Sequence, residues 1–385
     1  MKILILSRGI PSINDPQEGC FELDQAKALR DAGHEVVVMA VDSRVRRFWR
    51  KPGIEKKIID GITTYKLFTF PTSIIRHLFS FSLGIKIEVI EAKLLYKHVI
   101  KENGYFHVIH AHFLTSIYYA TKIKEKYGIP VIGTEHWSKV DNDVDSKDVQ
   151  YMGKRTYVNV DKLISVSDSL RKKILYSFNV NSVIIHNLID TSFLPISINK
   201  PNRDSFSIVL VGSLIHRKGF DYFIESFSKS RLAKENVMVT IIGGGPEFNN
   251  LFKQITNLGL TDKIKLIGQQ SKKVIFEKLN SANFFVLPSR SENFSVSVLE
   301  ALANGLPVVA TICGGIKECI NDSNGILVEV DNQNQMIKAL EEMYDNYRIY
   351  DRMKIRTNCL SLYSPESIAQ QINKVYESVI TQVNV

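Results

Sequence analysis

The chain contains 385 residues, of which 44% are hydrophobic and 23% charged, a composition typical of a folded protein and not of a disordered one. One hydrophobic core rarely serves so long a chain, so we expect two domains. No run of 18 or more apolar residues occurs, which excludes a membrane-spanning helix, and the apolar start is too short for a secretory leader. The four cysteines have no zinc-site spacing, so we expect reduced cytoplasmic thiols and no bound metal.

The net charge of +9 is unevenly distributed. Residues 1–195 hold 28 Lys and Arg against 21 Asp and Glu, whereas residues 196–385 hold 21 against 19. The segment Arg44–Lys57 alone contains seven cations and one anion, Glu55. The basic excess is therefore a local feature that needs its own explanation.

Short apolar strands alternate with helices in the first half of the chain. The predicted strands are Lys2–Ser7, Glu35–Ala40, Val108–Ala111, Val131–Thr134 and Leu163–Val166. Phe21–Asp31 and Thr115–Lys126 are the clearest helices between them. This alternation predicts an α/β domain whose parallel sheet is covered on both faces.

The same pattern restarts in the second half. The predicted strands are Ser207–Val211, Val237–Ile242, Ile264–Ile267, Phe284–Leu287 and Leu306–Thr311. The stretch Pro195–Asp204, rich in Pro, Asn and Ser, separates the two halves. We therefore predict an N-terminal domain over 1–195, a C-terminal domain over 205–363 and a final helix over 364–385. Two doubly wound domains facing each other would bind ligands in a cleft at the carboxyl ends of their strands.

The most informative motif runs from Ser289 to Ala301. A strand ends at Pro288, a polar turn carries Glu292, and a helix begins near Ser295. The backbone N–H groups of Phe294, Ser295 and Val296 at this helix start are suited to bind a phosphate. Glu300, one and a half turns further on, is placed to accept hydrogen bonds from vicinal hydroxyls such as those of a ribose. The simpler alternative is that Glu292 is a surface loop residue and Glu300 an exposed carboxylate on a helix, neither of which binds a ligand.

Two glycine turns support this interpretation. Gly212 ends a strand, and Arg217 and Lys218 follow in a short loop, where they can neutralise a diphosphate leaving group. Gly243 opens the run Gly243–Gly245, which lacks the dinucleotide spacing G-x-G-x-x-G. The alternative for the turn with Arg217 and Lys218 is a basic surface turn without a ligand.

These segments resemble the group-one, family-four retaining glycosyltransferases of the GT-B fold. The family's glutamate–seven residues–glutamate motif matches Glu292…Glu300, followed by Asn304-Gly305-Leu306-Pro307 and by Gly314-Gly315. The resemblance extends over nearly the whole chain. It implies that the second domain binds a nucleotide diphosphate sugar, that Glu292 contacts the sugar as a catalytic residue, and that no cofactor or metal takes part. It also implies a C-terminal helix that crosses back to the first domain.

The resemblance is looser in the first half. Gly19 and Cys20 look like part of the acceptor loop, and Val108–Phe113 looks like the family's histidine turn. By this resemblance His112 faces the reacting sugar and His136 lines the acceptor side. A hydrogen-bonded turn residue is the alternative for each, and His110 is expected to be structural.

The chain also departs from the family pattern. Ser213 stands where many members carry Arg, so Arg217 is expected to replace that cation, and Leu188 stands where Gly is usual. The D-x-D spacing in Asp141–Asp145 resembles a metal motif of another glycosyltransferase fold class. No strand leads into it, so we interpret it as a polar loop.

We therefore expect a metal-independent transferase that moves a hexose or related sugar to a glycan or lipid-linked acceptor, in cell-surface polysaccharide or lipopolysaccharide biosynthesis. The Arg44–Lys57 segment, with Phe48 and Trp49 among its cations, is expected to dock the protein on the anionic inner face of a membrane. A nucleotide-sugar epimerase of the same fold and a non-catalytic nucleotide-sugar-binding partner remain alternatives. A nucleic-acid binder is disfavoured because the cations are confined to one segment.

Overall fold

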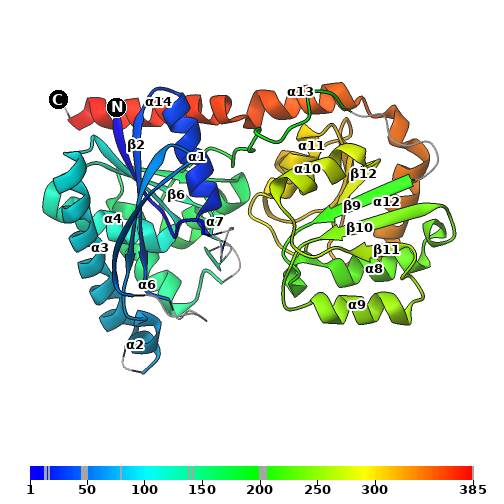
Figure 1. Cartoon of the computed structure of the whole chain (residues 1–385), viewed down its shortest axis with the longest axis horizontal. Coiled ribbons are helices and arrows are strands. Elements are labelled where there is room, and N and C mark those ends of the chain that lie inside the picture. Colours follow the sequence, from blue (N-terminus) through cyan, green and yellow to red (C-terminus); the bar gives the residue numbers. More distant parts are fainter. Residues whose placement is uncertain are drawn as a thin grey trace. The chain divides into compact units, whose positions relative to one another are not determined.

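The computed structural model describes residues 1–12, 15, 18–44, 51–78, 80–137, 139–140, 143–198 and 206–383. The chain divides into two compact units, the first made of Met1–Leu188 with Pro365–Val385 and the second of Ile189–Ser364 (Figure 1). The division falls before the predicted linker Pro195–Asp204. The reason is that the intervening residues are bonded into the second unit: Ile189 N–H donates to Tyr363 O over 3.0 Å, and Arg356 donates to Pro195 O over 2.7 Å.

The first unit contains an eight-stranded sheet in the order β3-β4-β2-β1-β5-β6-β7-β8. Its strands are β1 (Lys2–Leu6), β2 (Glu35–Asp42), β3 (Gly53–Ile59), β4 (Ile62–Phe68), β5 (Val108–His112), β6 (Val131–Glu135), β7 (Lys162–Ser165) and β8 (Val183–Ile184). Its helices are α1 (Cys20–Asp31), α2 (Thr72–Leu78), α3 (Phe81–Asn103), α4 (Phe113–Tyr127), α6 (Lys147–Thr156), α7 (Asp168–Phe178) and α14 (Pro365–Val383). Every predicted strand of this half is present, with its ends shifted by no more than two residues.

The sheet is parallel as predicted except at one edge, where an antiparallel strand was not expected. β3 pairs antiparallel with β4, which itself runs parallel to β2. The turn between β3 and β4 is Asp60-Gly61, and both residues have positive φ, 49° and 79°. A two-residue Asp-Gly turn of this kind joins adjacent antiparallel strands, so β3 lies at the edge of the sheet without a crossover helix.

The last helix, α14, packs against α1 and completes the core of the first unit. Ile368, Ile372 and Tyr376 are at most 1% exposed in that core. These are apolar positions of the tail that the sequence predicts to be helical. The predicted return of the C-terminal helix to the first domain is therefore confirmed.

The second unit contains a six-stranded sheet in the order β11-β10-β9-β12-β13-β14, with every recorded pair parallel. Its strands are β9 (Phe206–Val211), β10 (Val237–Ile242), β11 (Ile264–Leu266), β12 (Phe284–Leu287), β13 (Val308–Thr311) and β14 (Gly325–Val328). Its helices are α8 (Phe220–Lys229), α9 (Phe248–Asn257), α10 (Lys272–Ser281), α11 (Val296–Ala303), α12 (Gln333–Asn346) and α13 (Arg352–Tyr363). Both units are thus doubly wound α/β folds, as predicted.

The strand order of each sheet fixes where a ligand binds. In the first sheet the direction of winding reverses between β1 and β5, and in the second it reverses between β9 and β12. Ligands of open α/β sheets bind outside the carboxyl ends of the strands at such a reversal. The loops that follow β1, β5, β9 and β12 are therefore the places to look for function. Among the described residues, no helix combines the length and apolar character needed to cross a bilayer.

Candidate active site

In the second unit, the loop after β9 is held against the loop after β12. Arg290 N–H donates to Arg217 O over 2.8 Å, and the Arg217 guanidinium donates to Ser291 O over 2.7 Å. Gly219 has φ 66°, and a Cβ at this position would lie 2.0 Å from Pro288 O. Only glycine allows this approach, so Gly219 is what lets the Arg217-Lys218-Gly219 loop pack on the loop after β12.

Glu292 lies where these two loops meet. Its Oε1 accepts hydrogen bonds from Ser289 Oγ at 2.7 Å and from Lys218 Nζ at 2.5 Å, and its Oε2 is 3.9 Å from Arg217 Nη1. The Glu292 side chain is 7% exposed and that of Lys218 is 15% exposed. The structure therefore brings together three residues that sequence analysis placed in one site, although Lys218 and Glu292 are 74 positions apart.

Arg290 is a site-forming residue that sequence analysis missed. Its guanidinium forms a bidentate ion pair with the Asp221 carboxylate, with N–O distances of 2.8 and 2.9 Å, and donates to Asp331 over 2.9 Å. The hydrogen bond to Asp221 raises the pKa of Arg290 and outweighs burial, which lowers it, and the negative charges of Asp221 and Asp331 raise it further. Arg290, in the loop after β12, therefore ties that loop to α8 and to the β14–α12 connection. Its partners lie far apart in the sequence, which is why no local pattern indicates them.

The helix that follows Glu292 begins as predicted. Ser295 is the N-cap of α11, Phe294 before it is 5% exposed, and Val296 is the first helical residue. Glu300 follows on the same short helix and is half-buried. The free backbone N–H groups at the start of this eight-residue helix can donate hydrogen bonds to an anion, and no acidic side chain in the first turn would repel it.

Three glycines shape the walls of this site. Gly243 has φ 155°, and a Cβ there would lie 1.8 Å from the carbonyl oxygen of Gly212, so the ends of β9 and β10 meet backbone to backbone. Gly314 has φ 52°, and a Cβ there would lie 1.6 Å from Glu292 O. A side chain at Gly314 would therefore displace the Glu292 turn, and one at Gly243 would separate the ends of β9 and β10. Close backbone approach explains the glycines without any need for a dinucleotide motif.

In the first unit, three histidines line the ends of β5 and β6. The His110 and His112 rings stack with centroids 4.6 Å apart, and those of His112 and His136 stack at 5.2 Å. His112 Nδ1 lies 2.9 Å from His136 Nε2, and His136 Nδ1 lies 2.9 Å from Asn187 Oδ1. Burial lowers the pKa of His136 and of His110 to about 3, and it lowers that of His112 well below its usual value. All three rings are therefore neutral at pH 7.

His112 has a feature that its neighbours lack. It is fully buried, and its Nε2 has no hydrogen-bond partner among the described residues. Phe113, which follows it and starts α4, has φ 67°, a backbone conformation rare for a residue other than glycine. Such strain is concentrated at functional sites. The Arg8 guanidinium covers the Phe113 ring at 4.3 Å, which helps to hold this turn.

His110, in contrast, is fully satisfied. Its Nε2 contacts Thr134 Oγ1 at 2.7 Å, and its Nδ1 contacts Tyr376 Oη at 2.7 Å and Gln25 Nε2 at 3.3 Å. Tyr376 belongs to α14, so His110 links β5 to the C-terminal helix. These contacts agree with the structural role expected for it.

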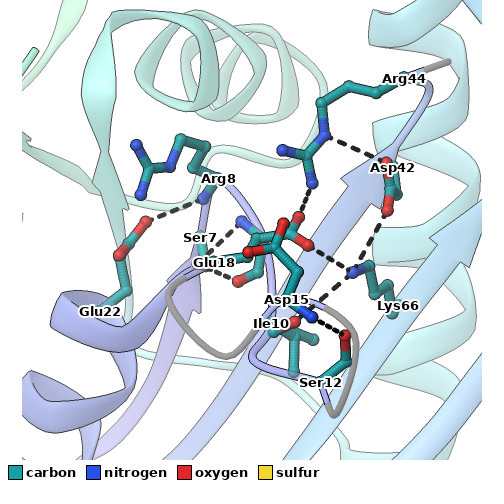
Figure 2. A network of polar contacts seen from close by, with 11 residues as sticks. Ser7, Arg8, Ile10, Ser12, Asp15, Glu18, Glu22, Asp42, Arg44 and Lys66 are labelled. Carbon is teal, nitrogen blue, oxygen red and sulfur yellow. Dashed lines mark hydrogen bonds and ion pairs between the residues drawn. The ribbon is translucent and has the colours of Figure 1, made fainter. Parts of the chain in front are cut away.

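The loop after β1 is held by a buried network of charged groups, which Figure 2 shows. Glu18 accepts from Lys66 Nζ at 3.1 Å and from Arg44, and Asp42 lies 3.2 Å from Lys66 Nζ and 3.3 Å from Arg44 Nε. Lys66, Glu18 and Asp42 are all at most 4% exposed. A buried ion pair requires such mutual compensation, because each charge alone would be costly to desolvate. The network fixes the end of the loop just before α1.

The two residues predicted for an acceptor loop, Gly19 and Cys20, follow this network. Gly19 is the N-cap of α1 with φ 71°, and a Cβ there would lie 2.1 Å from Gly9 O, so the loop closes on itself at this point. Cys20 is the first residue of α1 and is half-buried. Glu22 beside them accepts from Arg8 N–H at 3.2 Å, and burial raises its pKa. Sequence analysis missed Glu22, because a carboxylate on the first turn of a helix has no distinctive pattern.

The basic segment and the D-x-D segment are described only in part. Residues 45–50, and with them Phe48 and Trp49, lie outside the described residues, as does Asp141. Residues 53–57 belong to β3 and not to a loop. Lys56 Nζ lies 2.6 Å from Glu102 and Lys57 Nζ 2.8 Å from Glu55. Part of the charge expected on a free basic segment is therefore paired. The described portion of the chain contains no group of His, Cys, Asp and Glu suited to hold a metal ion.

Comparisons with known proteins fit this arrangement. The model of the family described as "Glycosyl transferases group 1" matches residues 196–358, and that of "Glycosyltransferase Family 4" matches residues 23–193. A phosphatidylinositol N-acetylglucosaminyltransferase subunit from Arabidopsis thaliana is 25% identical over 279 residues, which are 71% of this chain and 62% of the plant protein.

Solved structures are similar over almost the whole chain. Sucrose-phosphate synthase from Thermosynechococcus elongatus has a TM-score of 0.79 at 17% identity, over 99% of each chain. HepE from Anabaena in complex with UDP and glucose has a TM-score of 0.72 at 17% identity, over 98% of this chain and 100% of that one. At this identity the likeness shows a shared GT-B fold.

Proposed function

Because the chain belongs to the group 1 glycosyltransferases, we propose that it transfers a hexose or a related sugar from a nucleotide diphosphate sugar to a glycan or lipid-linked glycan acceptor. The observation that carries this proposal is the meeting of Lys218, Arg217, Glu292 and the start of α11 at the strand-order reversal of the second unit. Cations and helix amides converge there on a place suited to a diphosphate, and a carboxylate lies beside them.

The proposed roles in the second unit follow from this geometry. The diphosphate binds to Lys218, to Arg217 and to the amides of Phe294, Ser295 and Val296. Gly212 and Gly243 leave room for its close approach to the backbone, and Glu300 accepts from the ribose hydroxyls. Glu292 exchanges its bond with Lys218 for bonds with sugar hydroxyls when the donor binds. A diphosphate is the stronger partner for a lysine, because it carries more charge than one carboxylate.

The proposed roles in the first unit concern the sugar and the acceptor. His112 contacts a sugar hydroxyl or supports the positive charge that develops near the anomeric carbon, while Gly19, Cys20 and His136 line the acceptor side. We propose that the reaction retains the anomeric configuration. In this scheme the bond from the anomeric carbon to the phosphate oxygen breaks, the acceptor oxygen bonds to the same face of that carbon, and the acceptor proton passes to the leaving phosphate. No metal or other cofactor is required.

We further propose that the acceptor is lipid-linked and that the protein docks on an anionic membrane surface on the cytoplasmic side. The support comes from the outer face of α3. Leu83, Ile90 and Leu94 are 46%, 57% and 60% exposed on it. With 100° per residue, these three side chains and four lysines, Lys86, Lys93, Lys97 and Lys101, share one arc of the helix.

The charges on α3 are segregated. Its acidic residues, Glu88, Glu91 and Glu102, lie outside this arc, and within the described residues no ion pair involves its four lysines. Exposed aliphatic side chains among unpaired lysines suit the interface of an anionic bilayer. The aliphatic side chains can enter the headgroup region, and the lysines can bind lipid phosphates. A lipid-linked acceptor fits biosynthesis of a cell-surface polysaccharide or lipopolysaccharide.

One experiment tests the proposed reaction. Purified protein is incubated with radiolabelled UDP-glucose, UDP-galactose, UDP-N-acetylglucosamine and GDP-mannose, with and without a lipid extract as acceptor. We expect slow hydrolysis of one donor alone and transfer of its sugar to the extract, with the anomeric configuration retained in the NMR spectrum of the product. A donor converted to its epimer without acceptor would favour the epimerase. Binding of a nucleotide sugar without any turnover would favour the non-catalytic partner.

A further inference from the structure

The residues Asn187, His136 and His112 form a hydrogen-bonded row that ends at one unpaired atom. Asn187 Oδ1 is 2.9 Å from His136 Nδ1, and His136 Nε2 is 2.9 Å from His112 Nδ1. The row then ends at His112 Nε2, which is buried and has no partner among the described residues. Buried polar atoms are nearly always hydrogen-bonded, so an exception calls for an explanation.

The row determines the position of each ring proton. An amide oxygen only accepts, so the proton of neutral His136 must be on Nδ1, where it is donated to Asn187. Its Nε2 then has a lone pair and accepts, which requires that His112 carry its own proton on Nδ1. His112 Nε2 is consequently left with a lone pair and can only accept.

His110, two residues earlier on β5, has the opposite tautomer. Two groups face His110 Nδ1: the amide NH₂ of Gln25 at 3.3 Å, which only donates, and the hydroxyl of Tyr376 at 2.7 Å, which can donate as well. With both donating, Nδ1 accepts and we expect the proton of His110 on Nε2. His110 Nε2 then donates to Thr134 Oγ1 over 2.7 Å. The two stacked rings are thus held in different tautomers by different partners.

We infer that Asn187 and His136 are positioning residues that keep the proton of His112 on Nδ1 and so present its Nε2 as a hydrogen-bond acceptor to a hydroxyl group of the substrate. The part of this inference that concerns substrate rests on the proposed function. An acceptor nitrogen cannot bond to a phosphate oxygen or a carbonyl oxygen, because neither carries a proton. The partner of His112 is therefore a sugar hydroxyl and not the leaving diphosphate.

The tautomers can be read directly, without substrate. In long-range ¹H–¹⁵N spectra of protein labelled with ¹⁵N-histidine, protonated and unprotonated ring nitrogens resonate in separate ranges. Spectra of His112→Gln and His110→Gln assign the two signals by their disappearance. We expect His112 to carry its proton on Nδ1 and His110 on Nε2. A wild-type His112 protonated on Nε2 would overturn the inference.

Asn187→Leu removes the acceptor that orders the row. We expect the His112 signal to lose the Nδ1-protonated pattern, because His136 is then free to move its own proton to Nε2. Asn187→Asp keeps an acceptor oxygen and should preserve the pattern. The matched control is Asn373→Leu, since Asn373 Oδ1 accepts from His34 Nε2 at 2.8 Å in the same unit but outside the row. A His112 pattern unchanged in a folded Asn187→Leu variant would refute the positioning role.

Turnover provides a second measurement. With the donor that the panel identifies, Asn187→Leu should lower kcat about tenfold or more and change KM little, because the substrate hydroxyl must then accept from a ring N–H and turn its own proton away from His112. Asn187→Asp should restore most of the rate, and Asn373→Leu should match wild type. Equal kcat in Asn187→Leu and wild type would mean that the tautomer of His112 does not affect turnover and would refute the positioning role of Asn187 in the reaction. If no donor is turned over, the proposed function fails while the tautomer result stands on its own.

Discussion

Lys218 Nζ lies 2.5 Å from Glu292 Oε1, so the cation proposed for the diphosphate and the carboxylate proposed for the sugar neutralise each other in the free protein. Ser289 Oγ holds the same carboxylate oxygen at 2.7 Å. A donor that binds Lys218 must therefore displace Glu292 or share the lysine with it. Binding of the diphosphate to Lys218 would therefore release Glu292 to bind the sugar of the same donor.

Glu292→Gln tests that exchange. The amide keeps the shape of the side chain and a bond with Ser289 but no longer competes as an anion for Lys218. We expect the affinity for the free nucleoside diphosphate, measured by calorimetry with UDP, ADP and GDP, to stay the same or rise a few-fold. Turnover should fall ~10-fold or more, since a charge-assisted bond to the sugar is lost. Loss of nucleotide affinity as large as the loss of turnover would argue against separate roles for Lys218 and Glu292.

Glu300→Ala should weaken nucleotide binding by ~1–3 kcal/mol, the amount expected when a charge-assisted hydrogen bond to a ribose hydroxyl is removed. Calorimetry with the nucleoside diphosphate and its 2′,3′-dideoxy analogue gives a double-mutant cycle for this contact. Wild type should discriminate between the two ligands, and the variant should not. Equal discrimination in both proteins would mean that Glu300 does not contact the ribose.

His112→Ala should lower turnover far more than it weakens binding of the free nucleoside diphosphate. The reason is that the unpaired Nε2 is proposed to contact the transferred sugar and not the nucleotide. His110→Gln is the matched control on the same strand, because both ring nitrogens of His110 are already bonded within the protein. It should affect stability more than turnover. Near-normal turnover in a folded His112→Ala variant would assign His112 a purely structural role.

His110 should also make the protein less stable in acid. Burial lowers its pKa to about 3, whereas an unfolded histidine has a pKa of about 6.5. Between these values the unfolded chain binds a proton that the folded chain does not, so the free energy of unfolding falls as the pH falls, by up to ~1.4 kcal/mol per pH unit. Urea unfolding from pH 7 to 5 should therefore show a shallower pH dependence for His110→Gln. Parallel curves would contradict the burial of a neutral ring.

The strands and the donor turns could be predicted because their signals are local. Apolar runs that end in glycine or proline predict β9 and β12. The spacing between Glu292 and Glu300 predicts a turn followed by a helix that carries the second glutamate. The hairpin of β3 and β4 was missed, although Asp60-Gly61 between β-branched residues is a local signal as well.

Other features could not be predicted because they depend on contacts between distant segments. Asn187 follows β8 and meets His136 only when β6, β7 and β8 are neighbours in the sheet. Arg290 meets Asp221 across 69 residues, and no periodicity in the sequence relates the two. The division of the chain after Leu188 could not be predicted for the same reason, since Ile189 bonds to Tyr363, which is 174 residues later in the sequence.

The outer face of α3 should bind anionic membranes. Each lysine near such a surface contributes ~1 kcal/mol, so replacing Lys86, Lys93, Lys97 and Lys101 together by Gln should reduce binding by roughly 100-fold or more. The measurement is co-sedimentation with vesicles of phosphatidylglycerol and phosphatidylcholine at low salt, compared with phosphatidylcholine alone. Ile90→Gln with Leu94→Gln should weaken binding without changing the charge, because the aliphatic part of the contact is lost.

The matched control removes the same four charges from the second unit, with Gln in place of the exposed Lys253, Lys273, Lys278 and Lys338. It lowers the net charge of the protein equally but leaves the α3 face intact, so it should sediment nearly as well as wild type. Raised salt should release wild type, because screening acts on the lysine contribution. Equal losses in the two quadruple variants would mean that net charge alone drives adsorption. Wild type that stays in the supernatant with anionic vesicles at low salt would remove the membrane from the proposal and leave a soluble glycan as the acceptor.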